Sequence, residues 1–266
     1  MARPQLSGPI LEARDLTLRF GEVTAFQDVA FAVQPGELFA VIGPNGAGKT
    51  SLFNVLSRVY TPTSGQIALD GRDLTALRPR DLAGAGVART FQNLGLFGPL
   101  SVLDNVLVGR HHLMRSGALR AGFGLRSCRA EEREHTAAAM DALERTGMAD
   151  AASTAVENLA YGDRKRVEIA RALAMHPRLL LLDEPVAGMS ADERVEITEL
   201  VRAIHADGDL TILLVEHDMG MVMRVAERIL VLDFGRSIAI GSPAEIQADE
   251  AVIRAYLGAA PEATTA

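Results

Sequence analysis

The segment Gly43-Pro44-Asn45-Gly46-Ala47-Gly48-Lys49-Thr50 decides the fold of this chain. It matches the phosphate-binding pattern G-x-x-x-x-G-K-[ST] in full, and it follows an apolar run, Glu37 to Ile42, that reads as a buried strand. Its glycines let backbone N–H groups curl around phosphate oxygens, and the helix that begins after Gly48 adds a positive dipole end. The alternative, a glycine loop that merely caps a helix, does not account for the complete pattern in this context. The sequence therefore predicts a nucleoside triphosphate site.

Three side chains at the end of this segment have predicted roles in that site. We expect Lys49 to reach the β- and γ-phosphates and the Thr50 hydroxyl to ligate Mg²⁺. Ser51, the next residue, is a candidate donor to the α-phosphate. The helix that carries them is predicted to place Leu52, Leu56 and Val59 on one side.

A second apolar run, Leu179 to Leu182, ends in two acids. A central parallel strand delivers its C-terminal residues to the crevice where ligands bind. We expect Asp183 to hold Mg²⁺ through water and Glu184 to orient and polarise the attacking water. Without the phosphate-binding loop, such a pair would read as helix-capping acids.

Two further polar residues are candidates for the γ-phosphate region, because phosphoryl transfer depends on positioning and charge stabilisation. His217 directly follows the apolar run Thr211 to Val215. Gln92, in Thr90-Phe91-Gln92, is a candidate sensor of Mg²⁺ and water. A surface or core histidine and an ordinary loop glutamine are the alternatives.

The pattern along the chain predicts an α/β fold. Alternation at Leu16, Leu18 and Phe20 and the run Phe26 to Val33 indicate an N-terminal antiparallel β part. From about 94 to 159 the strand signals vanish, which predicts an inserted helical lobe. We expect strands and helices to alternate again afterwards, in a mainly parallel sheet. The predicted elements are strand Leu179 to Leu182, helix Ala191 to His205, strand Thr211 to Val215 and strand Arg228 to Leu232.

The helix from Ala191 has the clearest local signals. Ser190 and Glu193 have the spacing of a capping box. The apolar residues of its predicted buried face repeat at i, i+3, i+4 and i+7: Ile197, Leu200, Val201 and Ile204.

Composition excludes several classes of protein. Hydrophobic residues make up 48% of the 266 residues, but no apolar run approaches the roughly 20 residues of a membrane-spanning helix. The first ten residues show no secretory signal pattern. The single cysteine, Cys128, excludes an internal disulfide. A net charge of −7 argues against nucleic acid as the main partner.

Five arginines lie in a stretch without acidic residues. We interpret the stretch as a solvated face, with a surface near lipid headgroups as the alternative. They are Arg110, Arg115, Arg120, Arg126 and Arg129.

The order of these motifs resembles the nucleotide-binding domain of ABC transporters over nearly the whole chain, 1–266. The segment Leu159-Ala160-Tyr161-Gly162-Asp163 is similar to that family's signature segment. The resemblance implies a P-loop, RecA-like core over about 1–93 and 160–266, with the helical lobe over about 94–159. It implies that ATP is the nucleotide and that Phe20 stacks on adenine, for which a place on the core face with Leu16 is the alternative. Two such domains, self or paralogue, would close head to tail, each signature helix aiming its N-terminus at the partner's ATP.

Two departures from the family pattern bear on that contact. The usual signature is LSGGQ, so Ala160, Tyr161 and Asp163 replace serine, glycine and glutamine. The lost hydroxyl removes one hydrogen bond to a charged group, about 1.5–3 kcal/mol if fully made. Ser190 stands where an aspartate is usual, which affects the expected communication between the two sites.

These unusual segments resemble the ATPase subunits of branched-chain amino acid importers. They are Arg89 to Gln92, Asn158 to Gly162, Pro185 to Met189 and Val252 to Gly258. This implies peripheral association with the cytoplasmic face of the inner membrane, two permease subunits and, indirectly, an external binding protein. An importer of urea, amides or polar amino acids, a non-transport ABC ATPase and a small-molecule kinase are the alternatives.

Overall fold

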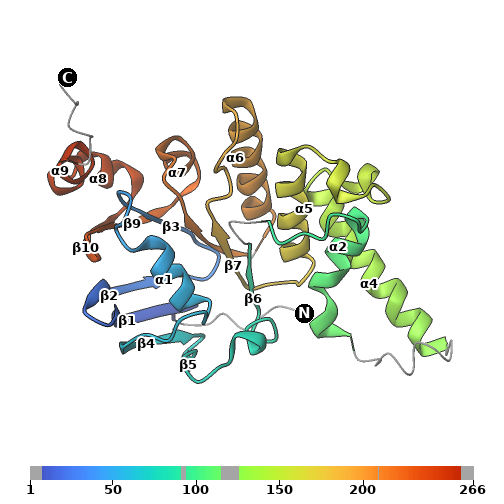
Figure 1. Ribbon diagram of the computed structural model, residues 1–266, viewed down its shortest axis with the longest axis horizontal. Helices are drawn as coiled ribbons and strands as arrows, with labels where there is room; N and C mark the ends of the chain where they lie inside the picture. The colour runs from blue at the N-terminus through green and yellow to red at the C-terminus, as the bar shows by residue number, and fades with distance from the viewer. Residues whose placement is uncertain (1–7, 91–93, 115–125, 209, 259–266) are drawn as a thin grey trace. The chain divides into compact units, whose positions relative to one another are not determined.

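The computed structural model describes residues 8–90, 94–114, 126–208 and 210–258. Figure 1 labels the helices and strands. Contacts within the chain divide it into two compact units. The first comprises Met1–Arg80, Leu181–Glu184 and Gly208–Ala266, and the second comprises Asp81–Leu180 and Pro185–Asp207. Each unit is described by itself below.

The first unit begins with an antiparallel sheet of strand order β2-β1-β4-β5. Its strands are β1 (Leu11–Phe20), β2 (Val23–Val33), β4 (Ser64–Leu69) and β5 (Arg72–Asp73). Asp70 and Gly71 join β4 to β5 with φ of 49° and 73°, the left-handed pair that a tight hairpin turn requires. The expected N-terminal antiparallel part is therefore confirmed.

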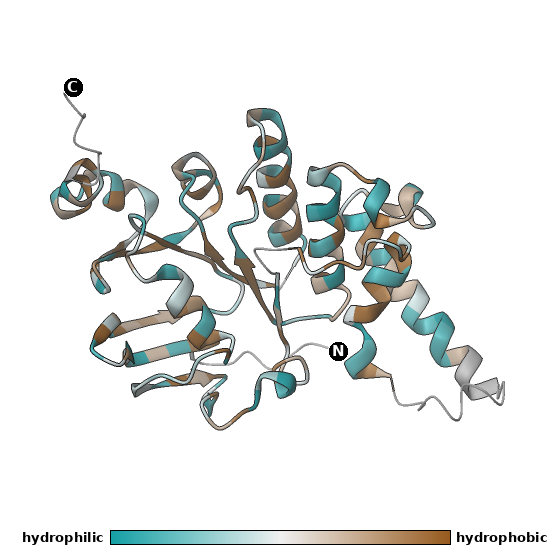
Figure 2. Cartoon of the chain, viewed as in Figure 1, coloured by the Kyte–Doolittle hydropathy of each residue, from teal (hydrophilic) through white to brown (hydrophobic). Residues whose placement is uncertain are grey.

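A second sheet supplies the centre of this unit, with strand order β10-β9-β3-β8 followed by the last residues of β7. These strands are β3 (Leu38–Ile42), β7 (Leu179–Asp183), β8 (Thr211–Val215), β9 (Arg228–Asp233) and β10 (Arg236–Gly241). β3 is parallel to both β8 and β9. Every residue of β3, β7 and β8 is buried, so these strands read as continuous apolar runs (Figure 2). The predicted strands agree with these bounds to within one residue.

Among its described residues, the first unit has the helices α1 (Lys49–Leu56), α7 (Met219–Val225), α8 (Pro243–Ala248) and α9 (Glu250–Gly258). The expectation that Val59 continues the buried side of α1 is wrong. The helix ends at Leu56, Arg58 adopts φ of 59°, and Val59 is 54% exposed. The chain therefore leaves the helix before Val59 can face the core.

The second unit is mostly helical, with the short strand β6 (Val87–Arg89) beside β7. The helices are α2 (Val102–Gly109), α4 (Arg126–Arg145), α5 (Tyr161–Leu173) and α6 (Ala191–Ala206). Short 3₁₀ turns lie at His111–Leu113, Ala149–Ala151 and Val156–Asn158, and a further one, Pro79–Asp81, spans the boundary with the first unit. α2, α4 and α5 pack against one another (Figure 1). The predicted lobe boundaries at 93/94 and 159/160 stay a prediction, and the compact unit groups α5 and α6 with this lobe.

α6 follows its sequence signals closely. The Ser190 hydroxyl accepts from the Glu193 N–H, and the Glu193 carboxylate accepts from the Ser190 N–H, which completes the predicted capping box. The four predicted face residues, Ile197, Leu200, Val201 and Ile204, are all buried.

One arginine departs from the predicted solvated face. Arg110 is 4% exposed, and its guanidinium donates to His135 Nδ1 at 2.9 Å and to the carbonyl of Ala174. Its charge is therefore used inside the lobe, where burial lowers the pKa of Arg110. Arg115 and Arg120 lie outside the described residues, and so do the side chains of Arg126 and Arg129.

Candidate functional site

The loop between β3 and α1 has the backbone geometry of a phosphate cradle. Gly43, Gly46 and Gly48 have φ of 151°, 80° and 97°, which side-chain-bearing residues rarely adopt. A Cβ on Gly43 would overlap the carbonyl oxygen of Leu232, and one on Gly48 would lie 2.6 Å from that of Ala25. Both conformation and space therefore favour glycine at positions 43 and 48, whereas at Gly46 only the conformation does.

Lys49 brings a buried positive charge to this loop. The residue is 6% exposed, and its Nζ donates to the carbonyls of Gly43 at 2.7 Å and Pro44 at 3.0 Å. Burial lowers the pKa of Lys49, and the nearby carboxylates of Glu184 and Glu216 partly offset the shift. The ammonium is thus held inside the curve of the loop, where a phosphate would meet it.

The remaining loop residues differ in exposure. Ala47 is buried, and its N–H donates to the carbonyl of Pro44 at 3.2 Å. Asn45, Gly46 and Thr50 are exposed, and Pro44, Gly48 and Ser51 are half-buried. The hydroxyls in the first turn of α1 are therefore accessible to a ligand.

The two predicted acids stand at the end of β7. Asp183 is 2% exposed, whereas the Glu184 side chain is 16% exposed. Glu184 has φ of 45°, a strained value for a non-glycine residue, while its N–H donates to the carbonyl of Val215 at 2.9 Å. Such strain is common at functional sites, and here it turns the chain sharply off the strand.

His217 lies close to Glu184, the other residue predicted to act near the γ-phosphate. Its Nδ1 is 3.9 Å from Glu184 Oε1 and 3.8 Å from Glu216 Oε2, and the imidazole is about half exposed. Lys49, Glu184 and His217 therefore belong to one cluster of polar side chains within the first unit.

Sequence reasoning missed Glu216. It is fully buried, and its Oε2 accepts from the N–H groups of His217 at 2.9 Å and Asp218 at 3.1 Å. Its position directly before a histidine at a strand end was an available signal. The carboxylate fixes the backbone turn that presents His217.

Phe20 is not part of the core. Leu16 and Leu18 are buried, but β1 has register irregularities between Leu16 and Arg19, and Phe20 is 48% exposed. Its ring meets that of Tyr60 edge-on, with centroids 5.2 Å apart. The core-face alternative is wrong, because half of the aromatic surface remains available for stacking.

Tyr256, on α9, approaches the same loop. Burial raises the pKa of Tyr256 to about 12, partly offset by the N–H of Gly43. Among the described residues, the phenol oxygen of Tyr256 has no hydrogen-bond partner of ordinary geometry. The Gly43 N–H therefore lies near this oxygen without forming a regular hydrogen bond. The last described helix therefore reaches the first residue of the phosphate-binding loop.

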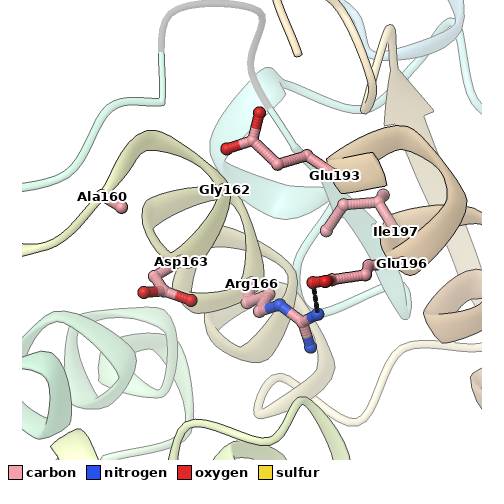
Figure 3. A pocket seen from close by; sticks show the side chains of 7 residues that line it. All are labelled: Ala160, Gly162, Asp163, Arg166, Glu193, Glu196 and Ile197. Atoms are coloured by element: carbon pink, nitrogen blue, oxygen red, sulfur yellow. Dashed lines mark hydrogen bonds and ion pairs between the residues drawn. The ribbon is translucent and has the colours of Figure 1, made fainter. Parts of the chain in front are cut away.

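The segment predicted to be the signature lies in the second unit, at the start of α5 (Figure 3). Ala160 is the N-cap, with extended backbone and no side-chain cap, as expected of a residue without a hydroxyl. Leu159 precedes it, Gly162 is buried, and the Tyr161 hydroxyl donates to the carbonyl of Ala187 at 3.3 Å. The helix therefore begins with N–H groups that its own N-cap side chain does not satisfy.

Gln92 lies outside the described residues. Within the described part of the chain, no three His, Cys, Asp or Glu side chains gather as a metal cluster. No helix there is both long and apolar enough to cross a membrane.

Two protein-family models match this chain. The family model described as ABC transporter matches residues 26–187, from β2 through the segment after the two acids. A second model, described as branched-chain amino acid ATP-binding cassette transporter, matches residues 236–262.

The chain belongs to the ABC transporter family.

Full-length relatives agree with this ABC assignment. The high-affinity branched-chain amino acid transport ATP-binding protein LivG of Escherichia coli is 41% identical over 96% of this chain and its own whole length. BraF of Pseudomonas aeruginosa, of the same description, is 40% identical over the same shares. A fructose import ATP-binding protein of Rhizobium meliloti is 35% identical over 92% of each chain.

Solved ABC cassettes share the fold. A nucleotide-free ATP-binding cassette from an ABC transporter has a TM-score of 0.78 at 28% identity, covering 93% of this chain and 98% of that one. An ABC cassette in its ADP conformation has a TM-score of 0.79 at 27% identity, covering 94% and 99%. The predicted family, the α/β P-loop fold and the assignment as an ATPase that binds ATP are confirmed.

Proposed function

We propose that this ABC ATPase drives the import of branched-chain amino acids. The carrying observation is the match of residues 236–262 to the branched-chain cassette model, together with 41% identity to LivG along the chain. The fructose relative shows that much of the cassette is common to importers of other cargoes. The C-terminal match therefore weighs more for cargo than the phosphate-binding loop does.

The proposed nucleotide site joins the start of α1 to the end of β7. Backbone N–H groups of Gly43 and of residues 45–48, with Lys49 and Ser51, bind the phosphates, and Pro44, which has no N–H, shapes the loop. Phe20 stacks on adenine, worth roughly 1–3 kcal/mol by analogy with base stacking. Thr50, Asp183 and Gln92 are the proposed Mg²⁺ residues. Hydroxyl, carboxylate and amide oxygens are hard donors of the kind Mg²⁺ prefers. When bound, the ion neutralises charge on the phosphate oxygens.

In the proposed chemistry, Glu184 accepts hydrogen bonding from water and polarises it toward the γ-phosphate. The strained backbone and partial burial of Glu184 hold the carboxylate at the strand end. His217, 3.9 Å away, is proposed to contact the γ-phosphate, and Gln92 to report nucleotide state to the lobe. Lys49 supplies the buried positive charge.

A second ABC ATPase subunit, self or paralogue, is the proposed partner. Leu159, Ala160, Tyr161 and Gly162 would face the partner's ATP in a head-to-tail pair. The support is the N-terminus of α5, whose N-cap side chain leaves backbone N–H groups unsatisfied and whose dipole favours anions.

The helical lobe is the proposed docking face for two permease subunits at the cytoplasmic face of the inner membrane. Exposed apolar side chains support this: Phe97, Leu100, Val108, Leu113 and Met114. An external binding protein would deliver the amino acid to the permeases.

Uptake in cells tests the cargo. Leucine, isoleucine or valine uptake should fall in cells lacking the chain and should return with the wild-type gene but not with Lys49→Ala. Urea, short amides and polar amino acids are measured alongside as alternative cargoes. A response confined to them would retain the ATPase and overturn the branched-chain assignment.

Turnover tests the partner proposal. The isolated chain should hydrolyse ATP poorly, because the signature segment must come from a second subunit. Activity should rise when the co-purifying ATPase subunit and permeases are added. Full transporter activity from the monomer would contradict the two-subunit site.

A further inference from the structure

A carboxylate of this chain lies over the start of α5. Glu193 belongs to the first turn of α6, and it lines a pocket with Ala160, Gly162 and Asp163 (Figure 3). A Cβ built on Gly162 would be 3.2 Å from Glu193 Oε1. The first turn of α5 therefore meets an acidic side chain from its own subunit.

The two oxygens of Glu193 have different surroundings. Oε2 accepts from the Ser190 N–H at 2.9 Å and from the Ser190 hydroxyl at 2.8 Å, which accounts for the capping of α6. Oε1 is the oxygen beside Gly162. Capping of α6 thus uses one oxygen, and the other is placed against α5.

Hydrogen bonds keep this carboxylate charged. The N–H and hydroxyl of Ser190, and to a smaller extent the N–H of Gly162, hold the pKa of Glu193 below its usual range. Glu193 is therefore ionised at neutral pH. The N–H of Gly162 interacts with an anion that belongs to the chain itself.

The other charges in the pocket do not neutralise Glu193. Asp163, in the first turn of α5, adds a second negative charge. Arg166 is held by Glu196, with Nη2 to Oε2 at 2.7 Å (Figure 3). The side chains that line this pocket consequently carry a net negative charge.

We propose that Glu193 is a positioning residue that competes with the partner's ATP phosphate for the N-terminus of α5, and so sets the strength of subunit closure. This inference rests on the proposed function, in which α5 receives that phosphate. On closure, Oε1 leaves Gly162 while Oε2 keeps its contacts with Ser190. While Glu193 occupies this position, the N-terminus of α5 binds phosphate weakly. The partner's ATP phosphate, which carries more than one negative charge, then displaces the singly charged carboxylate.

Glu193→Gln separates this role from helix capping. A capping box accepts either Glu or Gln at this position, so α6 should retain its cap. The amide has no charge, and with its oxygen on Ser190 its NH₂ group cannot accept from Gly162. The matched control is Glu196→Gln, which removes one charge from the same pocket without contacting Gly162.

Dimerisation is measured by sedimentation with ATP in full-length Glu184→Gln chains, alone or with the paralogous subunit that co-purifies. Glu193→Gln should tighten ATP-driven association about two- to fivefold, the size of one charge at a helix N-terminus. Glu196→Gln should leave it unchanged. Thermal unfolding of both variants checks that they fold. If Glu193 had only a structural role, Glu193→Gln would associate as strongly as the parent chain or more weakly.

The contact itself is tested without a partner. The Gly162 amide resonance should titrate with a pKa below the usual range of Glu and lose that titration in Glu193→Gln. No titration at Gly162, unchanged association in Glu193→Gln, or equal gains in both variants would overturn the proposal. A titrating Gly162 in a chain that never associates with ATP would instead contradict the proposed function.

Discussion

The helices α1 and α5 both begin with backbone N–H groups suited to phosphate. The charge of the nearby side chains is positive at α1 and negative at α5. At α1, Gly48 is the left-handed N-cap, no acid occupies the first turn, and the Lys49 ammonium lies inside the loop. At α5, Ala160 is an extended N-cap, Asp163 occupies the first turn, and Glu193 lies alongside. The helix dipole is common to both, so nearby side chains decide how strongly each end attracts an anion.

The difference also concerns rigidity. The α1 end is fixed by glycine conformations, and at Gly43 and Gly48 also by backbone atoms that leave no room for a side chain. The α5 end relies on side-chain contacts such as the exposed Tyr161 hydroxyl on Ala187. This difference fits the proposed function, in which the α1 end holds nucleotide and the α5 end binds and releases the nucleotide of a second subunit.

The largest expected effect concerns Glu184, the proposed water-polarising residue, which lies near the α1 end and has no counterpart at the α5 end. Glu184→Gln should lower turnover in the assembled transporter about 10²- to 10⁴-fold, the usual contribution of a general base. ATP should still bind, because Lys49 is intact, and the closed dimer should accumulate. Glu199→Gln, on the exposed side of α6, is the control. Near-normal hydrolysis by Glu184→Gln would refute its assignment.

The second test removes the charge that distinguishes the two helix ends. Lys49→Ala should weaken ATP binding about 10- to 100-fold, because a hydrogen bond to a charged group contributes about 1.5–3 kcal/mol. Isothermal titration measures the affinity. Lys49→Met, which retains much of the buried stem, should show the same loss. Restored binding in Lys49→Met would assign the effect to packing.

The third test addresses the rigid backbone of the α1 end. Gly43→Ala should reduce the free energy of unfolding by about 1–3 kcal/mol from backbone strain, with a further cost from overlap with Leu232. Gly46→Ala has similar strain, but no atom lies within 4 Å of the added carbon, so it should cost less. Urea unfolding measures both. Equal losses would show that the contact with Leu232 is unimportant.

The smallest effect is expected at the α5 end. Ala160→Ser adds an N-cap hydroxyl, which should stabilise α5 by about 0.5–1 kcal/mol. It should also tighten ATP-driven dimerisation by no more than about tenfold. This limit corresponds to about 1.5 kcal/mol, the lower end of the range for a hydrogen bond to a charged group. Sedimentation in the Glu184→Gln background measures this. An unchanged dimerisation constant would mean that residue 160 does not face the phosphate.

The sequence predicted α6, β7 and β8 well, because the interactions that specify them are between residues close together in the chain. The capping box of α6 needs two residues three apart, and the continuous apolar runs of β7 and β8 need burial on both faces. Val59 and Arg110 were predicted wrongly for the opposite reason. A left-handed Arg58 ended α1 early, and partners 25 and 64 residues away drew Arg110 into the lobe.

The sequence by itself determined the phosphate-binding loop, the two acids at the end of β7 and the order of motifs that resembles the ABC family. These depend on residue type and spacing along one chain, which a sequence displays directly. The tertiary structure alone decided that Glu216 supports the turn at His217, that Phe20 is exposed and that Glu193 lies against Gly162. Glu193 is 31 residues from Gly162 in the chain, and no local pattern encodes that approach. It arises because packing within the second unit brings the starts of two helices together.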